Sequence, residues 1–100
     1  MEFQLNREAE RLTLALSGTL DRSAVEALHR HLQRIGADKT REVVLDLARV
    51  DFLGTSALAA LLRFFQDSES AGRRVRFINV NHDLRALFGA VGLDRRLGIA

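Results

Sequence analysis

The segment from Arg41 to Phe65 changes its apolar period once, and this change constrains the fold more than any other feature of the sequence. Its first part is an almost unbroken apolar run, typical of a strand buried on both faces. From Ala57 onward the apolar residues recur at the i, i+3, i+4 and i+7 spacing of a helix that packs on a sheet. The strand residues are Val43, Val44, Leu45 and Leu47, and the helix residues are Leu58, Leu61, Leu62 and Phe65.

Between this strand and this helix lies Gly54-Thr55-Ser56, which places two hydroxyls at the predicted helix N-terminus. The first turn of a helix offers unpaired backbone N–H groups and a partial positive charge to an anion or a phosphorylated side chain. The same residue types also serve as plain N-caps, worth about 1 kcal/mol. The residues alone leave both interpretations open, and they make this turn the first candidate for a functional site.

The N-terminal part of the chain predicts a hairpin followed by a helix. Residues 2–5 and 12–16 alternate polar and apolar side chains, which favours two antiparallel strands at the edge of a sheet. Ser23, with Glu26 three residues later, is the expected N-cap of an amphipathic helix that Gly36 ends. The apolar positions of that helix are Val25, Leu28, Leu32 and Ile35.

The C-terminal part predicts one more strand and one more helix. The central helix is expected to end near Ala71-Gly72, and a strand over residues 73–80 follows, with Val75 and Phe77 inward and Arg74 and Arg76 outward. A third helix carries Leu84, Leu87, Phe88 and Val91 and is closed by Gly92, and residues 93–100 add a short turn or strand fragment.

The resulting order is β-β-α-β-α-β-α. Strands that alternate with helices of this length predict parallel crossovers, so we expect an α/β fold with a single mixed β-sheet of four to five strands and α-helices packed over it. Residues 1–100 are expected to form one domain. In open α/β sheets, ligands and partners usually bind at the carboxyl ends of the strands.

Composition narrows the classes of function. The sequence pI of about 10.4 suggests nucleic-acid binding, but the chain has no Cys or Tyr and a net charge of only +2, with acids and bases interleaved. A stripe that tracks phosphates would need stronger clustering. The absence of Cys excludes a disulfide scaffold, a thiolate metal site and a Cys nucleophile. With no signal-peptide pattern and no apolar run near 20 residues, the protein is expected in the cytoplasm, without membrane insertion.

The other polar candidates indicate no catalytic or metal site. Asp46 and Asp51 flank the central turn without a third acid or a nearby His. The histidines at 29, 31 and 82 lack a ligand spacing, because i and i+2 point to different sides of a helix. The arginines at 73, 74, 76, 95 and 96 are typical of a solvated face or of a contact surface for an acidic partner. No phosphate loop, nucleophile elbow or zinc spacing is present, so neither an enzyme nor a cofactor is expected.

Four stretches of the sequence resemble the STAS domain family, whose name joins sulfate transporters and anti-sigma-factor antagonists. Residues 16–21 are similar to the family's strand-end signature, in which a Gly, a variable residue, Leu and Asp21 follow the second strand. Residues 44–47 and 50–53 resemble its central strand and the turn that leaves it. Gly54-Thr55-Ser56-Ala57-Leu58 stands in the place of the family's Asp-Ser-Ser-Gly-Leu, and residues 87–88 and 92–93 match its last helix and exit.

The resemblance implies a non-enzymatic binding module whose partner is an anti-sigma-factor kinase, with a phosphatase as a further partner. It places the phosphorylated hydroxyl at Thr55, with Ser56 as second choice, and the partner contacts at Asp21 and residues 54–57. The family position of Asp21 puts it beside this loop, while an Asp at the end of a strand also serves as a helix cap or turn former, so both roles stay open for it. Gly54 replaces the family's Asp, and Ala57 replaces its Gly. Relatives with Thr at the acceptor position include the small subunit of a bacterial phospholipid-transport ATPase. The alternative function is therefore an accessory subunit of an ABC-type ATPase.

Overall fold

The computed structural model describes residues 2–37 and 40–90, and the elements follow the predicted order. The α/β class and the mixed sheet are confirmed, with four strands in the described part. Residues 91–100, which include the predicted helix end at Val91 and Gly92, lie outside it. The elements are β1 (Glu2–Glu8), β2 (Arg11–Leu20), the 3-10 turn η1 (Arg22–Ala24), α1 (Val25–Ala37), β3 (Glu42–Leu53), α2 (Thr55–Ser70), β4 (Arg74–Ile78) and α3 (His82–Ala90).

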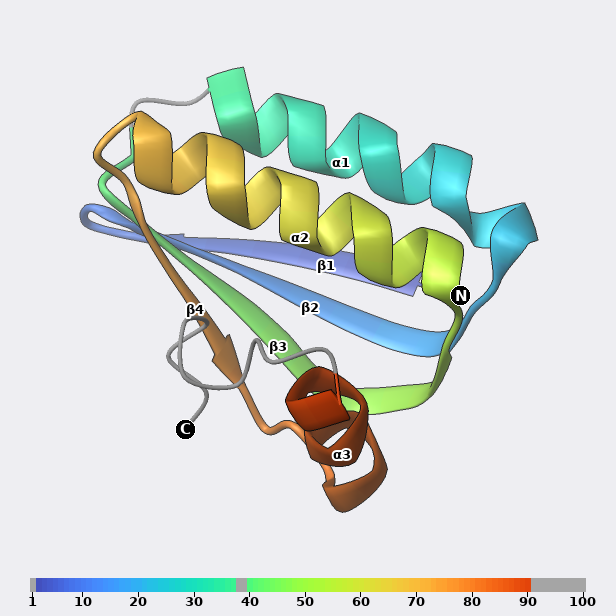
Figure 1. Cartoon of the computed structure of the whole chain (residues 1–100). Helices are drawn as coiled ribbons and strands as arrows, with labels where there is room; N and C mark the ends of the chain where they lie inside the picture. Colours follow the sequence, from blue (N-terminus) through green and yellow to red (C-terminus); the bar gives the residue numbers. More distant parts are fainter. Residues whose placement is uncertain (1, 38–39, 91–100) are drawn as a thin grey trace.

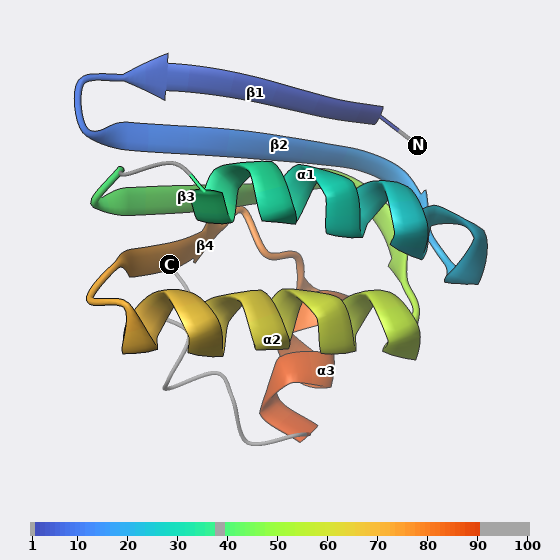
Figure 2. The same cartoon turned by 90° about the horizontal axis from the view of Figure 1, so that it is seen from above.

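The sheet has the strand order β1-β2-β3-β4 and combines both kinds of pairing. β1 and β2 form the expected antiparallel hairpin, while β2 with β3 and β3 with β4 are parallel. Helices α1 and α2 lie side by side over one face of the sheet, and α3 follows the end of β4 (Figures 1 and 2). Both α1 and α2 begin at the edge where β2 and β3 end (Figure 1), so the loops leaving these two strands lie next to each other.

Alternate residues of β2, β3 and β4 build the core under the helices. Leu14 pairs with Leu45 and Leu45 with Phe77, so their side chains share one face of the sheet. The ring of Phe77 contacts the ring of Phe88 from α3, with centroids 5.8 Å apart. The helices contribute residues at the predicted spacing, and all belong to one contiguous core. These are Leu28, Leu32 and Ile35 of α1, Leu58, Leu61 and Phe65 of α2, and Leu84 and Phe88 of α3.

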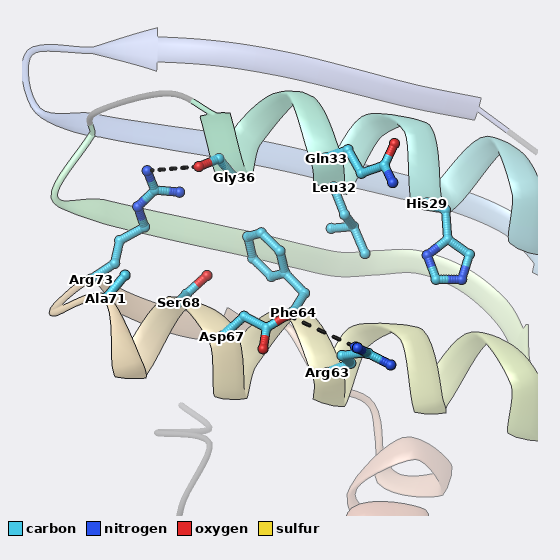
Figure 3. Close-up of a pocket in the computed structure, with 10 residues that line it drawn as sticks. All are labelled: His29, Leu32, Gln33, Gly36, Arg63, Phe64, Asp67, Ser68, Ala71 and Arg73. Atoms are coloured by element: carbon cyan, nitrogen blue, oxygen red, sulfur yellow. Dashed lines mark hydrogen bonds and ion pairs between the residues drawn. The ribbon is translucent and has the colours of Figure 1, made fainter.

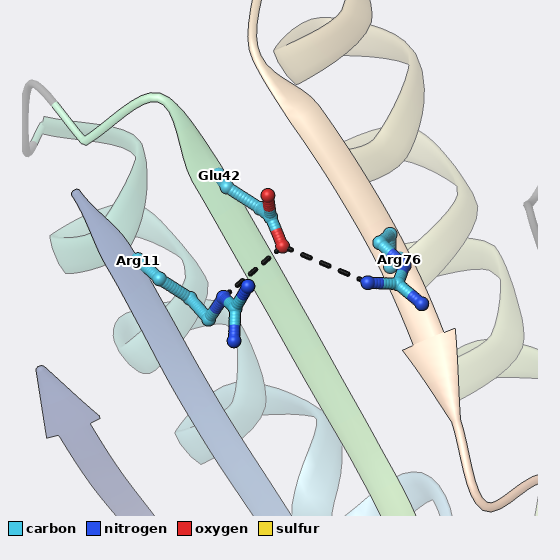
Figure 4. Close-up of polar contacts among 3 residues, drawn as sticks. All are labelled: Arg11, Glu42 and Arg76. Carbon is cyan, nitrogen blue, oxygen red and sulfur yellow. Dashed lines mark ion pairs between the residues drawn. The ribbon is translucent and has the colours of Figure 1, made fainter. Parts of the chain in front are cut away.

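The other face of the sheet carries polar side chains. Glu42 lies on the central strand β3 and forms ion pairs with Arg11 of β2 at 3.2 Å and Arg76 of β4 at 3.9 Å (Figure 4). Because Arg11 and Arg76 remain 50% and 40% exposed, solvent screens these pairs and each contributes little to stability. Their arrangement ties three neighbouring strands across the surface. Among the described residues, no helix is long and apolar enough to span a bilayer.

The start of α1 differs from the prediction that Ser23 is its N-cap. Asp21 instead caps the short turn η1, and its carboxylate accepts hydrogen bonds from the backbone N–H of Ser23 at 3.0 Å and from its hydroxyl at 2.6 Å. The prediction was wrong because an Asp two residues earlier competes for the same role and, as a charged acceptor, forms the stronger bond. Gly36 also lies within α1 and does not end it.

Arg73 closes the C-terminal end of α1 from another part of the chain. Its guanidinium donates to the backbone carbonyl oxygens of Ile35 at 2.8 Å and Gly36 at 3.4 Å, and the second of these bonds is drawn in Figure 3. A cation that binds the last carbonyls of a helix is favoured by the helix dipole. Of the arginines predicted as one basic region, Arg76 binds Glu42, Arg73 caps α1 and Arg74 is exposed, whereas those at 95 and 96 lie outside the described residues.

The strand β1 packs on α1 through Phe3 and His31, whose ring centroids lie 4.1 Å apart. Partial burial lowers the pKa of His31 below its ordinary value of 6.5, and the nearby charges of Arg34 and Arg30 lower it further.

This shift predicts a stability that depends on pH. The unfolded chain binds the His31 proton more tightly, so the contribution of His31 is fully present above pH 6.5 and is lost as the pH falls below it. Urea unfolding of the parent and of His31→Gln between pH 5 and pH 8 measures this. The free energy of unfolding of the parent should fall more steeply below pH 6.5 than that of the variant, and parallel curves would contradict the assignment.

Candidate functional site

The helix α2 begins at Thr55, and its N-cap is Gly54. The backbone of Gly54 is extended, with φ −75° and ψ 164°, and its carbonyl accepts the first helical bond from the N–H of Leu58 at 2.9 Å. Glycine has no side chain to cap the helix, so the first N–H groups receive no side-chain acceptor. The interpretation of the hydroxyls as N-caps therefore fails, because Thr55 and Ser56 stand inside the first turn.

Both hydroxyl-bearing side chains are exposed, and neither forms a hydrogen bond with a described residue. They lie at the positive end of a helix of 16 residues, at the edge where β2 and β3 end. A negative charge is stabilised there by about 0.3 to 1 kcal/mol. The site can thus accept a phosphoryl group without any loss of an existing hydrogen bond or of packing.

Asp21 and Gly54 come from different strands and lie next to each other. The N–H of Gly54 donates to the carbonyl oxygen of Leu20 at 2.9 Å, which ties the end of β3 to the end of β2. A Cβ at position 54 would lie 3.7 Å from the Cα of Asp21. The structure therefore places Asp21 beside the Gly54-Thr55-Ser56 turn, at the position expected from the sequence.

The carboxyl of Asp21 is fully exposed and ionised at neutral pH. The hydrogen bond from the hydroxyl of Ser23 lowers its pKa, with smaller contributions from the backbone N–H groups of Ser23 and Ala24, while desolvation opposes the shift. The surface next to Thr55 therefore already carries one negative charge, and it would carry more after phosphorylation.

Two further residues alter the predicted surface. Ala57, expected to contact a partner, is completely buried in the core beneath the first turn of α2, so its side chain is not available for binding. Phe52, by contrast, is 54% exposed, although an aromatic residue in a strand usually signals the core. In a regular strand, position 52 would share the buried face of Val50. The next apolar residue that is buried is instead Leu53, three positions after Val50, and this spacing is the one hint in the sequence that the regular alternation is interrupted.

The glycine at position 54 leads to a prediction about stability. A Cβ there would meet the carbonyl oxygen of Leu20 at 3.3 Å and the ring of Phe52 at 3.4 Å, which is close for either replacement. Gly54→Ala and Gly54→Asp both add a Cβ at this position. The difference between their free energies of unfolding therefore measures what the Asp carboxylate contributes as an N-cap. We expect Gly54→Asp to be more stable than Gly54→Ala by about 1 kcal/mol, since the carboxylate can accept N–H groups of the first turn. Urea unfolding measures this, and equal stabilities would show that the carboxylate forms no cap.

Asp46, another polar candidate from the sequence, has a structural role. Asp46 accepts the backbone N–H of Ala48 and the side-chain amide of Asn79, each at 3.0 Å, and so connects β3 to the chain after β4. Asn79 has a left-handed backbone with φ 57°, which Asn tolerates better than most residues. Residues 2–37 and 40–90 contain no group of three His, Asp or Glu side chains that could hold a metal ion.

A groove of about 450 Å³ lies between α1 and α2, towards the C-terminal ends of both helices (Figure 3). Leu32 and Phe64 are apolar residues along it, and Arg63 forms an ion pair with Asp67 at 4.0 Å. On α2 the groove spans residues 63–71, whereas the hydroxyls stand on the first turn. It therefore does not include the candidate site.

The fold and the hydroxyl pair together describe a small α/β domain with an exposed acceptor at a helix N-terminus. A family model described as "Mlab, STAS domain" matches residues 3–99. The chain belongs to the STAS domain family. No curated protein sequence matches it.

Solved structures of anti-sigma factor antagonists share this fold. The antagonist SpoIIAA in its unphosphorylated form is 23% identical, with 99% of this chain and 88% of that chain covered and a TM-score of 0.82. The Bacillus cell fate determinant SpoIIAA in its phosphorylated form is 24% identical, with 99% and 91% covered and a TM-score of 0.79. An antagonist from Mycobacterium paratuberculosis is 20% identical, with 98% and 83% covered and a TM-score of 0.88.

Proposed function

We propose that this protein is an anti-sigma-factor antagonist that is switched by phosphorylation of Thr55. In this account the unmodified domain captures an anti-sigma factor that is also a kinase, and thereby releases a sigma factor for transcription in the bacterial cytoplasm. The kinase ends the interaction by phosphorylating Thr55, and a phosphatase restores it. The domain itself catalyses nothing. Asp21, Gly54 and Ser56 share the contact surface with Thr55.

One observation carries the proposal, namely the exposed Thr55 hydroxyl at the start of α2, which neither caps the helix nor bonds to another described residue. A phosphate there adds about −1.5 to −2 charges and three acceptor oxygens. The helix N-terminus tolerates this charge, so the fold remains intact. At a partner interface the same dianion costs several kcal/mol through desolvation and like-charge contact, and each 1.4 kcal/mol is tenfold in affinity.

The comparisons support the proposal through the relatives' names. SpoIIAA is called an anti-sigma factor antagonist and has been solved in unphosphorylated and phosphorylated forms. A protein with this fold thus remains folded in both forms, as a phosphorylation switch at Thr55 requires. The replacement of the family's Asp by Gly54 implies a kinase that recognises the turn by its backbone and hydroxyls instead of a carboxylate.

A direct test combines co-purification with a kinase assay. The parent chain is used as bait in its own cells, and the captured protein is purified and incubated with the chain and ATP. We expect a protein kinase that places phosphate on Thr55, that fails on Thr55→Val and that still modifies Ser56→Ala. A captured kinase that leaves both hydroxyls unmodified would disprove the switch.

The second candidate function is an accessory subunit of an ABC-type phospholipid-transport ATPase, with Thr55 as an unmodified contact. The threonine at the acceptor position favours it, because that transporter subunit resembles this chain at the same place. The two functions predict different captured proteins, a kinase in one case and an ABC-type ATPase in the other.

A further inference from the structure

The C-terminal half of β3 extends beyond its pairing with β4. β4 pairs with β3 only from Glu42 to Asp46, where Ile78 is the last partner, and β3 continues to Leu53. Over this second half of β3, the described residues pair with it on one side only, through β2. Phe52 lies on this projecting end, two residues before Gly54.

Phe52 is unusual among the large apolar side chains that the structure describes. Only Leu5 and Phe52 are exposed, at 50% and 54%, and Leu5 lies on β1, away from the turn. One edge of the Phe52 ring comes within 3.4 Å of the point where a Cβ of residue 54 would stand. The ring thus flanks the backbone that immediately precedes Thr55.

We propose that Phe52 is the apolar anchor of the partner interface, and that its ring enters an apolar pocket of the partner protein beside the Thr55 hydroxyl. This inference rests on the proposed function, because it concerns the same surface. Aromatic residues, Phe among them, are enriched at protein–protein interfaces, and a few buried side chains contribute most of the binding energy where water is excluded around them. A projecting ring requires a concave partner, so the occupant presents a pocket.

The surroundings of the ring favour a protein over other partners. Asp21 lies beside the turn, Asp51 directly precedes Phe52 in β3, and both are exposed, while the exposed Thr19 pairs with Phe52 across the strands. The exposed Arg22 and Arg49 balance these two charges, so this part of the surface lacks the excess of basic side chains that binds anionic lipids or nucleic acids. Hydroxyls and carboxylates around one apolar ring instead match the polar rim and apolar centre of a protein–protein interface.

The anchor also explains how the phosphate acts. When the ring is buried in the partner, the neighbouring position 55 loses access to water, and a charge placed there must give up its hydration without a replacement. The penalty of a negative charge at position 55 therefore depends on Phe52. Removal of the ring opens the interface to water, so both the affinity and the effect of the charge decrease together.

A double-mutant cycle with the purified captured protein tests this, with calorimetry or surface plasmon resonance as the measurement. We expect Phe52→Ala to weaken binding at least about tenfold, the factor equivalent to 1.4 kcal/mol, while Leu5→Ala, the matched control, stays within about twofold. Thr55→Glu should lower the affinity by a smaller factor in the Phe52→Ala background than in the parent. Thermal unfolding of each variant ensures that only folded protein is compared.

The outcomes separate the two proposals. If Thr55→Glu weakens binding and Phe52→Ala does not, the anchor is wrong and the switch stands. If Phe52→Ala weakens binding and Thr55→Glu does not, the anchor stands and the switch is wrong. Equal effects of Leu5→Ala and Phe52→Ala would overturn the anchor, as would an undiminished effect of Thr55→Glu without the ring. Binding of the parent to anionic phospholipid vesicles that Phe52→Ala abolishes would also overturn it, in favour of a membrane partner.

Discussion

Thr55→Glu is expected to reduce the affinity for the partner at least about 30-fold, equivalent to about 2 kcal/mol, while the free energy of unfolding does not fall. The side chain is exposed on the first turn of α2, where a carboxylate is favoured by the helix dipole. At the interface the same charge is desolvated against the partner. Titration calorimetry measures the first effect, and urea unfolding measures the second.

Thr55→Gln provides the matched control, since Gln and Glu have nearly the same size and differ in charge. We expect Thr55→Gln to retain most of the affinity. Equal losses in the two variants would assign the effect to steric bulk and would remove the electrostatic basis of the switch. A loss of folding in Thr55→Glu would contradict the placement of Thr55 on an exposed first turn.

Phe77→Ala is expected to lower the free energy of unfolding by about 3 to 5 kcal/mol and the Tm by more than about 12 °C. Phe77 is completely buried on the helix-covered face of β4 and packs on Phe88, so its removal leaves a cavity that the core cannot fill. The total stability of a domain this size is about 5 to 15 kcal/mol, so this variant approaches the limit of folding. Circular dichroism melting curves measure the change.

Phe52→Ala is the control for this prediction because it makes the same chemical change at an exposed position. Its effect on the free energy of unfolding should stay within about 0.5 kcal/mol. The two variants therefore separate folding from binding, since we expect Phe77→Ala to lower the stability and Phe52→Ala to lower the affinity for the partner. Similar losses of stability would contradict the exposure of Phe52.

The elements that the sequence predicts well are those whose apolar pattern is long. The change from a strand period to a helical period near Thr55 locates both β3 and α2, and the Gly72 that follows α2 has the left-handed φ of 78° that ends helices. The start of α1 was mispredicted because Asp21 and Ser23 are both good caps, and only the geometry decides between them. Local capping competition of this kind leaves no periodic signal.

The candidate site could be predicted in position but not in its details. The motif around Thr55 locates the turn, and topology brings Asp21 to it because β2 and β3 are neighbours. The exposure of Phe52 accompanies a register shift of β3 against β2 between Val50 and Phe52, at which the sequence only hints through the spacing of Val50 and Leu53. The cap that Arg73 supplies to α1 joins residues nearly forty positions apart and was absent from the sequence pattern.

Mass spectrometry of the protein isolated from its own cells shows whether Thr55 is phosphorylated there. Trypsin releases the peptide from Val50 to Arg63, which contains both hydroxyls of the turn and no other Ser or Thr. We expect part of this peptide to carry one phosphate on Thr55, and we expect the phosphorylated fraction to change with growth conditions. A peptide that stays unmodified under all conditions, while the protein remains bound to a partner, would contradict the proposed switch.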